Sequence, residues 1–511
     1  MAVAVAVALP VRLAIRGSLH DKQSSAAVRV PFVFRAVFRG SKRTRYTVAC
    51  ERYVTLSRPV EFAFSSYLVP RTDGCTYDHR MEGFFIPIHG HTRATEHASV
   101  TVRALMLTTV SSLLSSAPYT PPPMIHIHAN TLYDAGLQQG RIAGDRIRGW
   151  LATPEMRSLI NYTLSDGRKA FQQLKHDNGK AFPSLLKELT GVAAGASVPL
   201  DHIWTATMIN ELESLRSPGP GEYNQGHCSD LYAVPDGGYA SGFAHGHNED
   251  WPGPIWRFWY LVAYHPASAA AEFEPCAGVV YPGGLVGWAS SWNSKGIWLT
   301  QNSLFPKASR PGGLVSSFAQ RAALCGVGSG TTIRTNGSEA ATGPAPRAHA
   351  ASSLEEVIQR LVAPEAVGVA GWSSAASVNI VSMHEKRMAN VEVHLDRHAR
   401  HDIRAHGSGA NYSHFNMFKE LEVGTADVPG VSSVHRQARV DALPAVRTRA
   451  DIAARLSDSA DAAYPIYRNM TLHTVILDGP TGRLDLWCCG LRASVDPPVY
   501  SWNLHKFFET D

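Results

Sequence analysis

Residues 226–234 read Gly-His-Cys-Ser-Asp-Leu-Tyr-Ala-Val, and residues 246–251 read Gly-His-Asn-Glu-Asp-Trp. Two β-rich runs joined by a glycine-containing turn are typical of a β-hairpin. We therefore expect a strand after Cys228, a turn at 235–238 and a return strand through Tyr239 to Ala244. Cys228 stands at the head of the first strand. On position alone it is more simply a core residue, because free cysteine is among the most buried residue types.

Helical and strand-like segments alternate in blocks along the rest of the chain. Residues 134–151 have apolar side chains near helical spacing, and Gly136 and Gly140, four residues apart, indicate a face where another backbone comes close. Further helices are predicted over 154–174, 182–194, 201–215, 313–324 and 353–362. Strands are predicted over 238–245, 256–264, 278–281, 285–292, 296–302, 377–383 and 388–395, with a closing hairpin over 473–487. Strand-dense blocks between helical ones predict an α+β fold, with two sheets covered by helices.

The ordered set of motifs resembles the acyl-coenzyme A:6-aminopenicillanate acyltransferase family. This family is a branch of the N-terminal-nucleophile hydrolases that also includes β-alanyl-amine hydrolases. The resemblance rests on Cys228-Ser229, the hairpin, Asn248–Trp251, Gly287 and Asn293–Gly296, and it covers roughly residues 124–505. It implies a four-layer αββα sandwich. It also implies a precursor that cuts itself between His227 and Cys228, which leaves a small helical chain associated with a larger strand-rich chain.

The resemblance implies a role for each matching residue. Cys228 becomes the N-terminal nucleophile, and its own α-amino group lies close enough to act as the base. Asp250 orients that α-ammonium group, and Asn411 supplies an oxyanion donor beside a backbone N–H. Supporting positions in the pocket or the framework are Asn248, Trp251, Asn293 and Glu392. His227 departs from the family pattern, which has glycine there; its bulk would slow the cut, or its imidazole would assist it as a base.

The predicted function is that of an autoprocessed cysteine amidohydrolase or acyltransferase acting on linear amide bonds of small N-acyl compounds. No cofactor or metal is expected, although an acyl-coenzyme A as acyl donor stays open, as does the choice between water and an amine as acceptor. One alternative is an unprocessed, non-catalytic relative in which His227 blocks cleavage and the pocket serves as a binding module. Another is a papain-like hydrolase, which needs a dedicated histidine partner for Cys228.

Residues 1–123 differ in composition from the rest. They hold 15 Lys and Arg against 7 Asp and Glu, whereas residues 124–511 hold 33 against 36. The proline run 121–123 is therefore the predicted boundary between a basic, poorly structured extension and the catalytic body at 124–511. The extension is Arg-rich and acid-poor, which fits a targeting segment, a disordered extension or sequence ahead of the true start. We expect it to be dispensable.

Several other functions are disfavoured. The body lacks the clustered basic residues of a nucleic-acid binder, and no apolar run reaches the roughly 18 residues of a membrane span. The histidines at 89, 91, 97, 126 and 128 fit no standard zinc spacing. The seven cysteines are odd in number, which argues against a disulfide framework. Cys488 and Cys489 are expected to face opposite sides of one strand.

Overall fold

The computed structural model describes residues 27–34, 47–55, 61–69, 121–218, 228–326, 349–406, 411–423 and 430–509. The chain divides into two compact units, residues 1–117 and 118–511. Within the described part of the first unit, three strands form an antiparallel sheet: β1 (Ala27–Phe34), β2 (Thr47–Thr55) and β3 (Glu61–Val69). The composition of this region predicted a poorly structured extension and no strand. The histidines at 89, 91 and 97 lie outside the described residues.

The larger sheet of the second unit has eight strands within the described ranges. In spatial order they are β13 (Arg397–Asp402), β12 (Arg387–His394), β11 (Ala375–Ser382), β10 (Ile297–Ser303), β9 (Ser291–Asn293), β8 (Cys276–Val280), β7 (Tyr260–Pro266) and β4 (Met124–Ala129). The pair β4–β7 is parallel, and the other pairs are antiparallel. The predicted strands at 296–302, 377–383 and 388–395 are confirmed to within two residues at each end.

The smaller sheet holds the predicted hairpin that follows Cys228. Its strands, in spatial order, are β14 (Ser413–His414), β5 (Ser229–Ala233), β6 (Ala244–Asp250), β15 (Thr471–Asp478), β16 (Arg483–Cys488) and β17 (Tyr500–Asn503). β5 and β6 pair antiparallel, with Asp230 opposite His247, and β15 and β16 form the predicted closing hairpin.

The two sheets pack face to face through polar as well as apolar side chains. The Tyr232 hydroxyl of β5 donates to Asn379 Oδ1 of β11 at 2.6 Å, and Trp298 Nε1 of β10 donates to His245 Nδ1 of β6 at 3.0 Å. These side chains are fully buried. A buried polar group left without a partner costs free energy, so these bonds fix how one sheet lies on the other.

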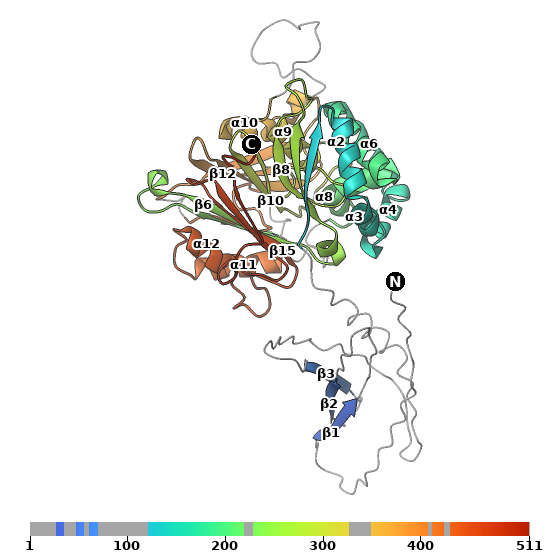
Figure 1. Cartoon of the computed structure of the whole chain (residues 1–511), viewed down its shortest axis with the longest axis vertical. Helices are drawn as coiled ribbons and strands as arrows, with labels where there is room; N and C mark the ends of the chain where they lie inside the picture. Colours follow the sequence, from blue (N-terminus) through green and yellow to red (C-terminus); the bar gives the residue numbers. More distant parts are fainter. Residues whose placement is uncertain are drawn as a thin grey trace, which may run out of the picture. The chain divides into compact units, whose positions relative to one another are not determined.

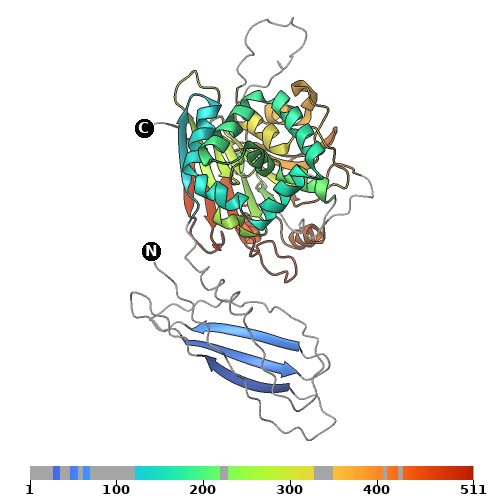
Figure 2. The ribbon, with the colours of Figure 1, turned by 90° about the vertical axis from the view of Figure 1, so that its right-hand side faces the viewer.

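Helices cover the outer side of the larger sheet (Figure 1), and Figure 2 looks onto this helical face. They are α2 (Leu132–Ile142), α3 (Gly144–Leu151), α4 (Pro154–Leu164), α5 (Arg168–Ala181), α6 (Pro183–Ala196), α7 (Leu200–Thr207) and α8 (Ile209–Arg216), joined by α9 (Ser316–Cys325) and α10 (Leu354–Val362). The predicted close approach at Gly136 and Gly140 is confirmed. A Cβ at Gly136 would lie 2.0 Å from the Glu188 carbonyl oxygen of α6, and one at Gly140 would lie 2.3 Å from the Val192 carbonyl oxygen.

On the far side of the smaller sheet lie α11 (Val431–Asp441) and α12 (Arg449–Leu456) (Figure 1). Ile452 and Leu456 of α12 would be the first atoms met by a side chain at Gly246 of β6, so this strand needs glycine where the helix presses on it. The α+β class is therefore confirmed. None of the described helices is both long and apolar enough to cross a membrane.

Several strands begin or end at other residues than the sequence patterns predicted. The return strand of the hairpin begins at Ala244 and runs to Asp250, because residues 239–241 form a short 3-10 helix between two glycines with positive φ. Residues 254–257 likewise form a 3-10 helix, so the strand predicted from Trp256 begins at Tyr260. The segment predicted as a strand from Leu285 contributes only Ser291–Asn293.

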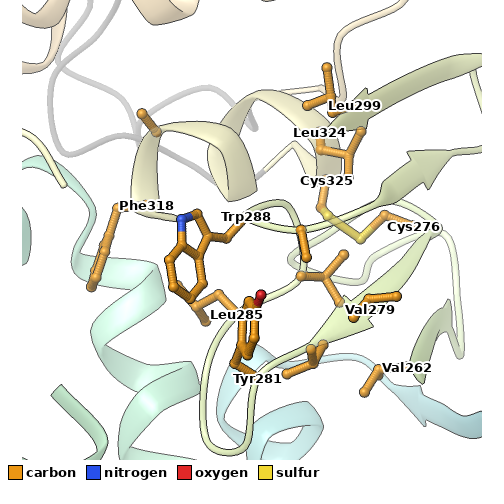
Figure 3. Close-up of a cluster of buried hydrophobic side chains, with 14 of the residues drawn as sticks. Val262, Cys276, Val279, Tyr281, Leu285, Trp288, Leu299, Phe318, Leu324 and Cys325 are labelled. Carbon is orange, nitrogen blue, oxygen red and sulfur yellow. A yellow bond between two sulfur atoms is a disulfide. The ribbon is translucent and has the colours of Figure 1, made fainter. Parts of the chain in front are cut away.

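The cysteine predictions also need correction. A disulfide joins Cys276 of β8 to Cys325 at the end of α9, inside the buried apolar cluster drawn in Figure 3. Packing of the helix on the sheet brings together two residues that are 49 positions apart. The sulfur atoms of Cys488 and Cys489 lie 2.8 Å apart and do not face opposite sides. The reason is that β16 ends at Cys488 and Cys489 has a φ of +68°.

We expect a chain beginning at Met124 to fold and to behave as the full chain does. Within the described residues, truncation at this point removes two bonds made by the proline run: Tyr500 to the Pro122 carbonyl, and the Leu261 N–H to the Pro123 carbonyl. Each bond contributes about 1 kcal/mol. Thermal melting and the assays proposed below, run beside the full chain and a chain beginning at Pro118, check this. If the chain beginning at Met124 is insoluble while the chain beginning at Pro118 is soluble and folded, the start of the folded body lies upstream of Met124.

Candidate active site

Cys228 lies at the end of the buried hairpin, directly before β5. The side chain is 2% exposed, and every residue of β5 is buried. Its thiol donates to Glu249 Oε1 on the neighbouring strand β6, with Sγ 3.3 Å from the oxygen. The predicted nucleophile is thus buried inside the protein, and its thiol is hydrogen-bonded to Glu249, which was not among the predicted site residues.

Three side chains of β6 point to the same face as Cys228. His245, His247 and Glu249 are two residues apart, and alternate residues of a strand share a face. Asp230 of β5 lies between the histidines: Oδ2 is 2.8 Å from His247 Nδ1, and Oδ1 is 3.0 Å from His245 Nε2. The other nitrogen of His247 is 3.1 Å from Glu249 Oε2. We call Cys228, Asp230, His247 and Glu249 the thiol cluster.

The thiol cluster is tied to the opposite sheet and to the loop after β8. Thr300 Oγ1 of β10 donates to Asp230 Oδ1 at 2.6 Å. The Tyr281 hydroxyl donates to Glu249 Oε1, the oxygen that also accepts from Cys228. Since Tyr281 is packed against Trp251 and Trp288, the carboxylate of Glu249 is held in a single orientation.

Buried charges within the cluster stabilise one another. Burial opposes ionisation of Asp230, but the charge of His247 and hydrogen bonds from both histidines outweigh it and hold the pKa of Asp230 well below its usual value. Burial also acts to lower the pKa of His247, yet Asp230, Cys228 and Glu249 together hold that pKa well above the ordinary value. The pKa of Glu249 is lowered despite burial, chiefly by the hydrogen bond from His247. The cluster therefore carries an imidazolium between two carboxylates.

The thiol itself is held in its protonated form. Burial, followed by the charge of Glu249, raises the pKa of Cys228 to about 12. The thiolate is the nucleophilic form of cysteine. Cys228 is consequently unreactive in this state, and any reaction at its sulfur requires a nearby group to accept the proton.

Asp250 follows Glu249 and points to the opposite face of β6. Its Oδ1 accepts from Thr471 Oγ1 at 2.5 Å, and its Oδ2 lies 3.3 Å from Arg468 Nε. Burial raises the pKa of Asp250, although Arg468 and Arg436 act to lower it. Asp250 is thus part of a buried ion-pair network beside the thiol cluster, on the side away from the Cys228 sulfur.

Arg436 of α11 links this network to the backbone of Cys228. Its Nη1 donates to the Cys228 carbonyl at 2.6 Å and to Ser229 Oγ at 2.9 Å. Its Nη2 donates to Asn416 Oδ1 at 2.9 Å. Burial lowers the pKa of this guanidinium to about 9. No sequence motif pointed to Arg436, because it lies 208 residues from Cys228.

The structure places Asn411 away from the thiol cluster. Its side chain is exposed, and its φ of +59° puts it in a turn before β14. The asparagine of this segment that lies near Cys228 is Asn416, which is buried and bonded to Arg436 and to the Ser303 carbonyl. A second asparagine, Asn416, stands five residues after Asn411 in the sequence. Only the turn at Asn411 decides which of the two side chains points into the protein.

The four supporting residues are all buried, and three of them hold backbone in place. Asn248 donates to the carbonyls of Leu456 and Ile466. Asn293 donates to the carbonyls of Leu324 and Ala351. Glu392 accepts from His414 and from the N–H groups of residues 419–421. Trp251 packs its ring against Tyr281 and Trp288. His227 lies outside the described residues.

Cys228, His247 and Glu249 also have the atoms needed to hold a metal ion. Their donor atoms all lie within 4.8 Å of one another. Sulfur, imidazole nitrogen and carboxylate oxygen are the ligands that zinc takes, and Asp230 holds the second nitrogen of His247, as carboxylates do for zinc-bound histidines. Within the described residues, the histidines predicted not to bind metal, His126 and His128, stack on His265 at the edge of the larger sheet.

Comparison with known proteins gives one similarity that spans most of the chain. The chain is 23% identical over 374 residues to a beta-alanyl-dopamine/carcinine hydrolase from Drosophila melanogaster. The match covers 70% of this chain and 88% of that protein. No protein-family model matches the chain. The relative is a hydrolase, and this supports the broad prediction of amide hydrolysis.

Proposed function

We propose that the chain is an autoprocessed cysteine amidohydrolase or acyltransferase with the four-layer αββα fold of N-terminal-nucleophile hydrolases. One observation carries the proposal. The thiol of Cys228 stands at the head of a buried strand inside a cluster of charged groups. An amide is a poor electrophile, and its cleavage benefits from a covalent intermediate that divides the reaction into two steps. The likeness to a hydrolase supports the same assignment.

In the proposed maturation, the peptide bond between His227 and Cys228 is cut. The Cys228 sulfur attacks the carbonyl carbon of His227, the C–N bond breaks, and water then hydrolyses the thioester. The products are a helical chain and a strand-rich chain that stay associated. Cutting turns the Cys228 amide nitrogen into an amine of pKa about 7.7–8.0, which accepts the thiol proton during turnover.

In the proposed turnover, Cys228 forms an acyl-enzyme with a small N-acyl compound. The role of orienting the new α-ammonium group stays assigned to Asp250, whose carboxylate also pairs with Arg468. The role of oxyanion donor stays assigned to Asn411 as a prediction. Its exposed position means that its amide must turn inward to act. Water as acceptor gives hydrolysis, and an amine gives acyl transfer; an acyl-coenzyme A is a further candidate donor.

The name of the Drosophila relative sets the first compounds to test, β-alanyl-dopamine and carcinine. Against the papain-like alternative stands the state of His247. Both of its ring nitrogens bond to carboxylates, Nδ1 to Asp230 and Nε2 to Glu249. An imidazolium held in this way has no free nitrogen with which to accept the Cys228 proton. The binding-module alternative has no observation in its favour.

The test combines fragment sequencing with an activity assay. The purified full chain is run on a denaturing gel, its fragments are sequenced from their N-termini, and the two compounds are offered to it. We expect a large fragment that begins at Cys228 and measurable amide hydrolysis. A chain that stays intact and nevertheless hydrolyses the amides would overturn the N-terminal-nucleophile mechanism. An intact and inactive chain would favour the binding module.

A further inference from the structure

The first cut cannot use the base that serves later turnover. Before cleavage, the α-nitrogen of Cys228 belongs to a peptide bond, and an amide nitrogen has no basic lone pair. The thiol is protonated and buried. Maturation therefore requires another acceptor within reach of the sulfur. The following inference rests on the proposed function and deepens it.

Glu249 occupies the acceptor position. Its Oε1 lies 3.3 Å from the Cys228 sulfur and receives the thiol hydrogen bond. The carboxylate cannot swing away, because Tyr281 donates to Oε1 and His247 Nε2 lies 3.1 Å from Oε2. Its side chain is 6% exposed, so bulk water has little access. A proton acceptor must lie within hydrogen-bond reach of the proton it takes, and Glu249 meets this condition.

His247 is the other titratable group beside the sulfur, and the geometry gives it a different role. With Asp230 on Nδ1 and Glu249 on Nε2, the ring donates a proton to a carboxylate on each side. It therefore has no vacant nitrogen. Its positive charge stabilises the negative charge that develops on the sulfur as the proton leaves.

We propose that Glu249 takes the thiol proton of Cys228 in the self-cleavage step and returns it to the Cys228 nitrogen. The S–H bond breaks while the S–C bond to the His227 carbonyl carbon forms, and the proton moves to Glu249 Oε1. As the tetrahedral intermediate collapses, the C–N bond breaks and the protonated Glu249 supplies the hydrogen of the new amine. Water then hydrolyses the thioester. The overall change is one peptide bond and one water converted to a carboxyl group and an amine, with Glu249 regenerated.

The charge of Glu249 allows this role to be separated from a purely electrostatic one. A carboxylate beside the thiol raises the thiol pKa. If Glu249 were only a neighbouring charge, removing it would make the thiol more acidic and cutting faster. If Glu249 takes the proton, removing it makes cutting slower. The two roles therefore predict effects of opposite sign.

The decisive variant is Glu249→Gln, which keeps the size of the side chain and removes the acceptor. Full-length chains are synthesised in a cell-free system, and the appearance of the fragment beginning at Cys228 is followed over time. We expect cutting to slow by about 100-fold or more, the usual scale of general-base catalysis. Glu213→Gln is the matched control: it makes the same substitution at a partly buried carboxylate of α8 that pairs with Arg216 outside the thiol cluster, so this variant should cut at the wild-type rate. Circular dichroism checks that each variant is folded.

The pH dependence gives a second readout that a structural role would not change. The groups that face Glu249 are Cys228 from the start of β5, His247 on β6, Tyr281 after β8 and His473 on β15, with Asp230 and Asp250 beyond them. The cutting rate of the wild type should fall as acid protonates Glu249, below the ordinary pKa of about 4.3. Glu249→Asp, which retains a carboxylate, should cut more slowly but show the same fall of the cutting rate in acid. Glu249→Gln should not show this fall.

The outcomes separate this inference from the proposed function. A wild-type chain that is not cut before Cys228 overturns both. A wild type that is cut, together with a Glu249→Gln chain that is cut at the same rate or faster, overturns only the role of Glu249. If the Gln variant does not fold, the Asp variant decides. A folded Glu249→Asp chain that is cut, but whose cutting rate does not fall in acid, would contradict proton transfer from Cys228 to residue 249.

Discussion

Replacing Cys228 with alanine should leave the chain uncut and should abolish the proposed amide hydrolysis. The alanine removes the only atom that can form the covalent bond in both reactions of the proposed mechanism, and no neighbouring group of the thiol cluster is a nucleophile of comparable strength. The substitution itself is mild, because alanine fits the buried site and leaves the hydrogen bond from Arg436 to the backbone carbonyl of residue 228 intact. Denaturing electrophoresis and product analysis measure the two losses.

Cys489→Ala is the matched control for this experiment. Cys489 is a free, partly buried thiol directly after β16, and its loss should leave both cutting and hydrolysis as in the wild type. Cys228→Ser adds an intermediate case, since a hydroxyl can attack a carbonyl but is a weaker nucleophile than a thiolate. Activity that survives in a Cys228→Ala chain would remove Cys228 from the chemistry and with it the proposed function.

Replacing Arg321 with methionine should destabilise the folded protein by about 3–5 kcal/mol, the usual cost of removing one partner from a buried ion pair. Arg321 of α9 and Glu188 of α6 are both fully buried. The guanidinium lies within 3.2 Å of both carboxylate oxygens. Without Arg321, Glu188 retains only the hydroxyl of Tyr264 as a polar partner in this group. The shift of the urea midpoint, with the slope checked for constancy, measures the effect.

Two further variants make the measurement specific. Lys187→Met breaks an ion pair with Glu272 that is largely exposed, and should leave the midpoint unchanged within error because solvent screens such pairs. The double variant Arg321→Met with Glu188→Gln removes both charges and should recover part of the lost stability. A single Arg321→Met variant as stable as the wild type would mean that Glu188 finds another partner or water.

Local sequence patterns predicted the elements whose cause is local. The run after Cys228 has the composition of a strand, and the glycine-containing turn closes a hairpin wherever the strands are packed. Gly136 and Gly140 indicated the close contact of α2 with α6, because only a residue without a side chain lets two helix backbones approach so closely. The α+β class follows from the order of such blocks.

The beginnings of strands were less predictable. Tyr239 continues a β-rich run, yet the glycines on both sides of residues 239–241 adopt positive φ and divert the chain into a 3-10 helix. Trp256 is similarly apolar but belongs to a turn. Apolar composition shows that a residue is buried; it does not show whether its backbone extends or turns, because that depends on the contacts made by the neighbouring elements.

The sequence alone determined that Cys228 heads a buried strand. Only the tertiary structure decided what surrounds the sulfur. The register of β5 on β6 sets Asp230 opposite His247, and the period of the strand then places Glu249 beside Cys228 and turns Asp250 away. Arg436 reaches the Cys228 carbonyl from a helix far along the chain. Side-chain direction reverses at each residue of a strand. A motif that is one position off in sequence therefore selects Asp250, which points away from the thiol, in place of Glu249, which contacts it.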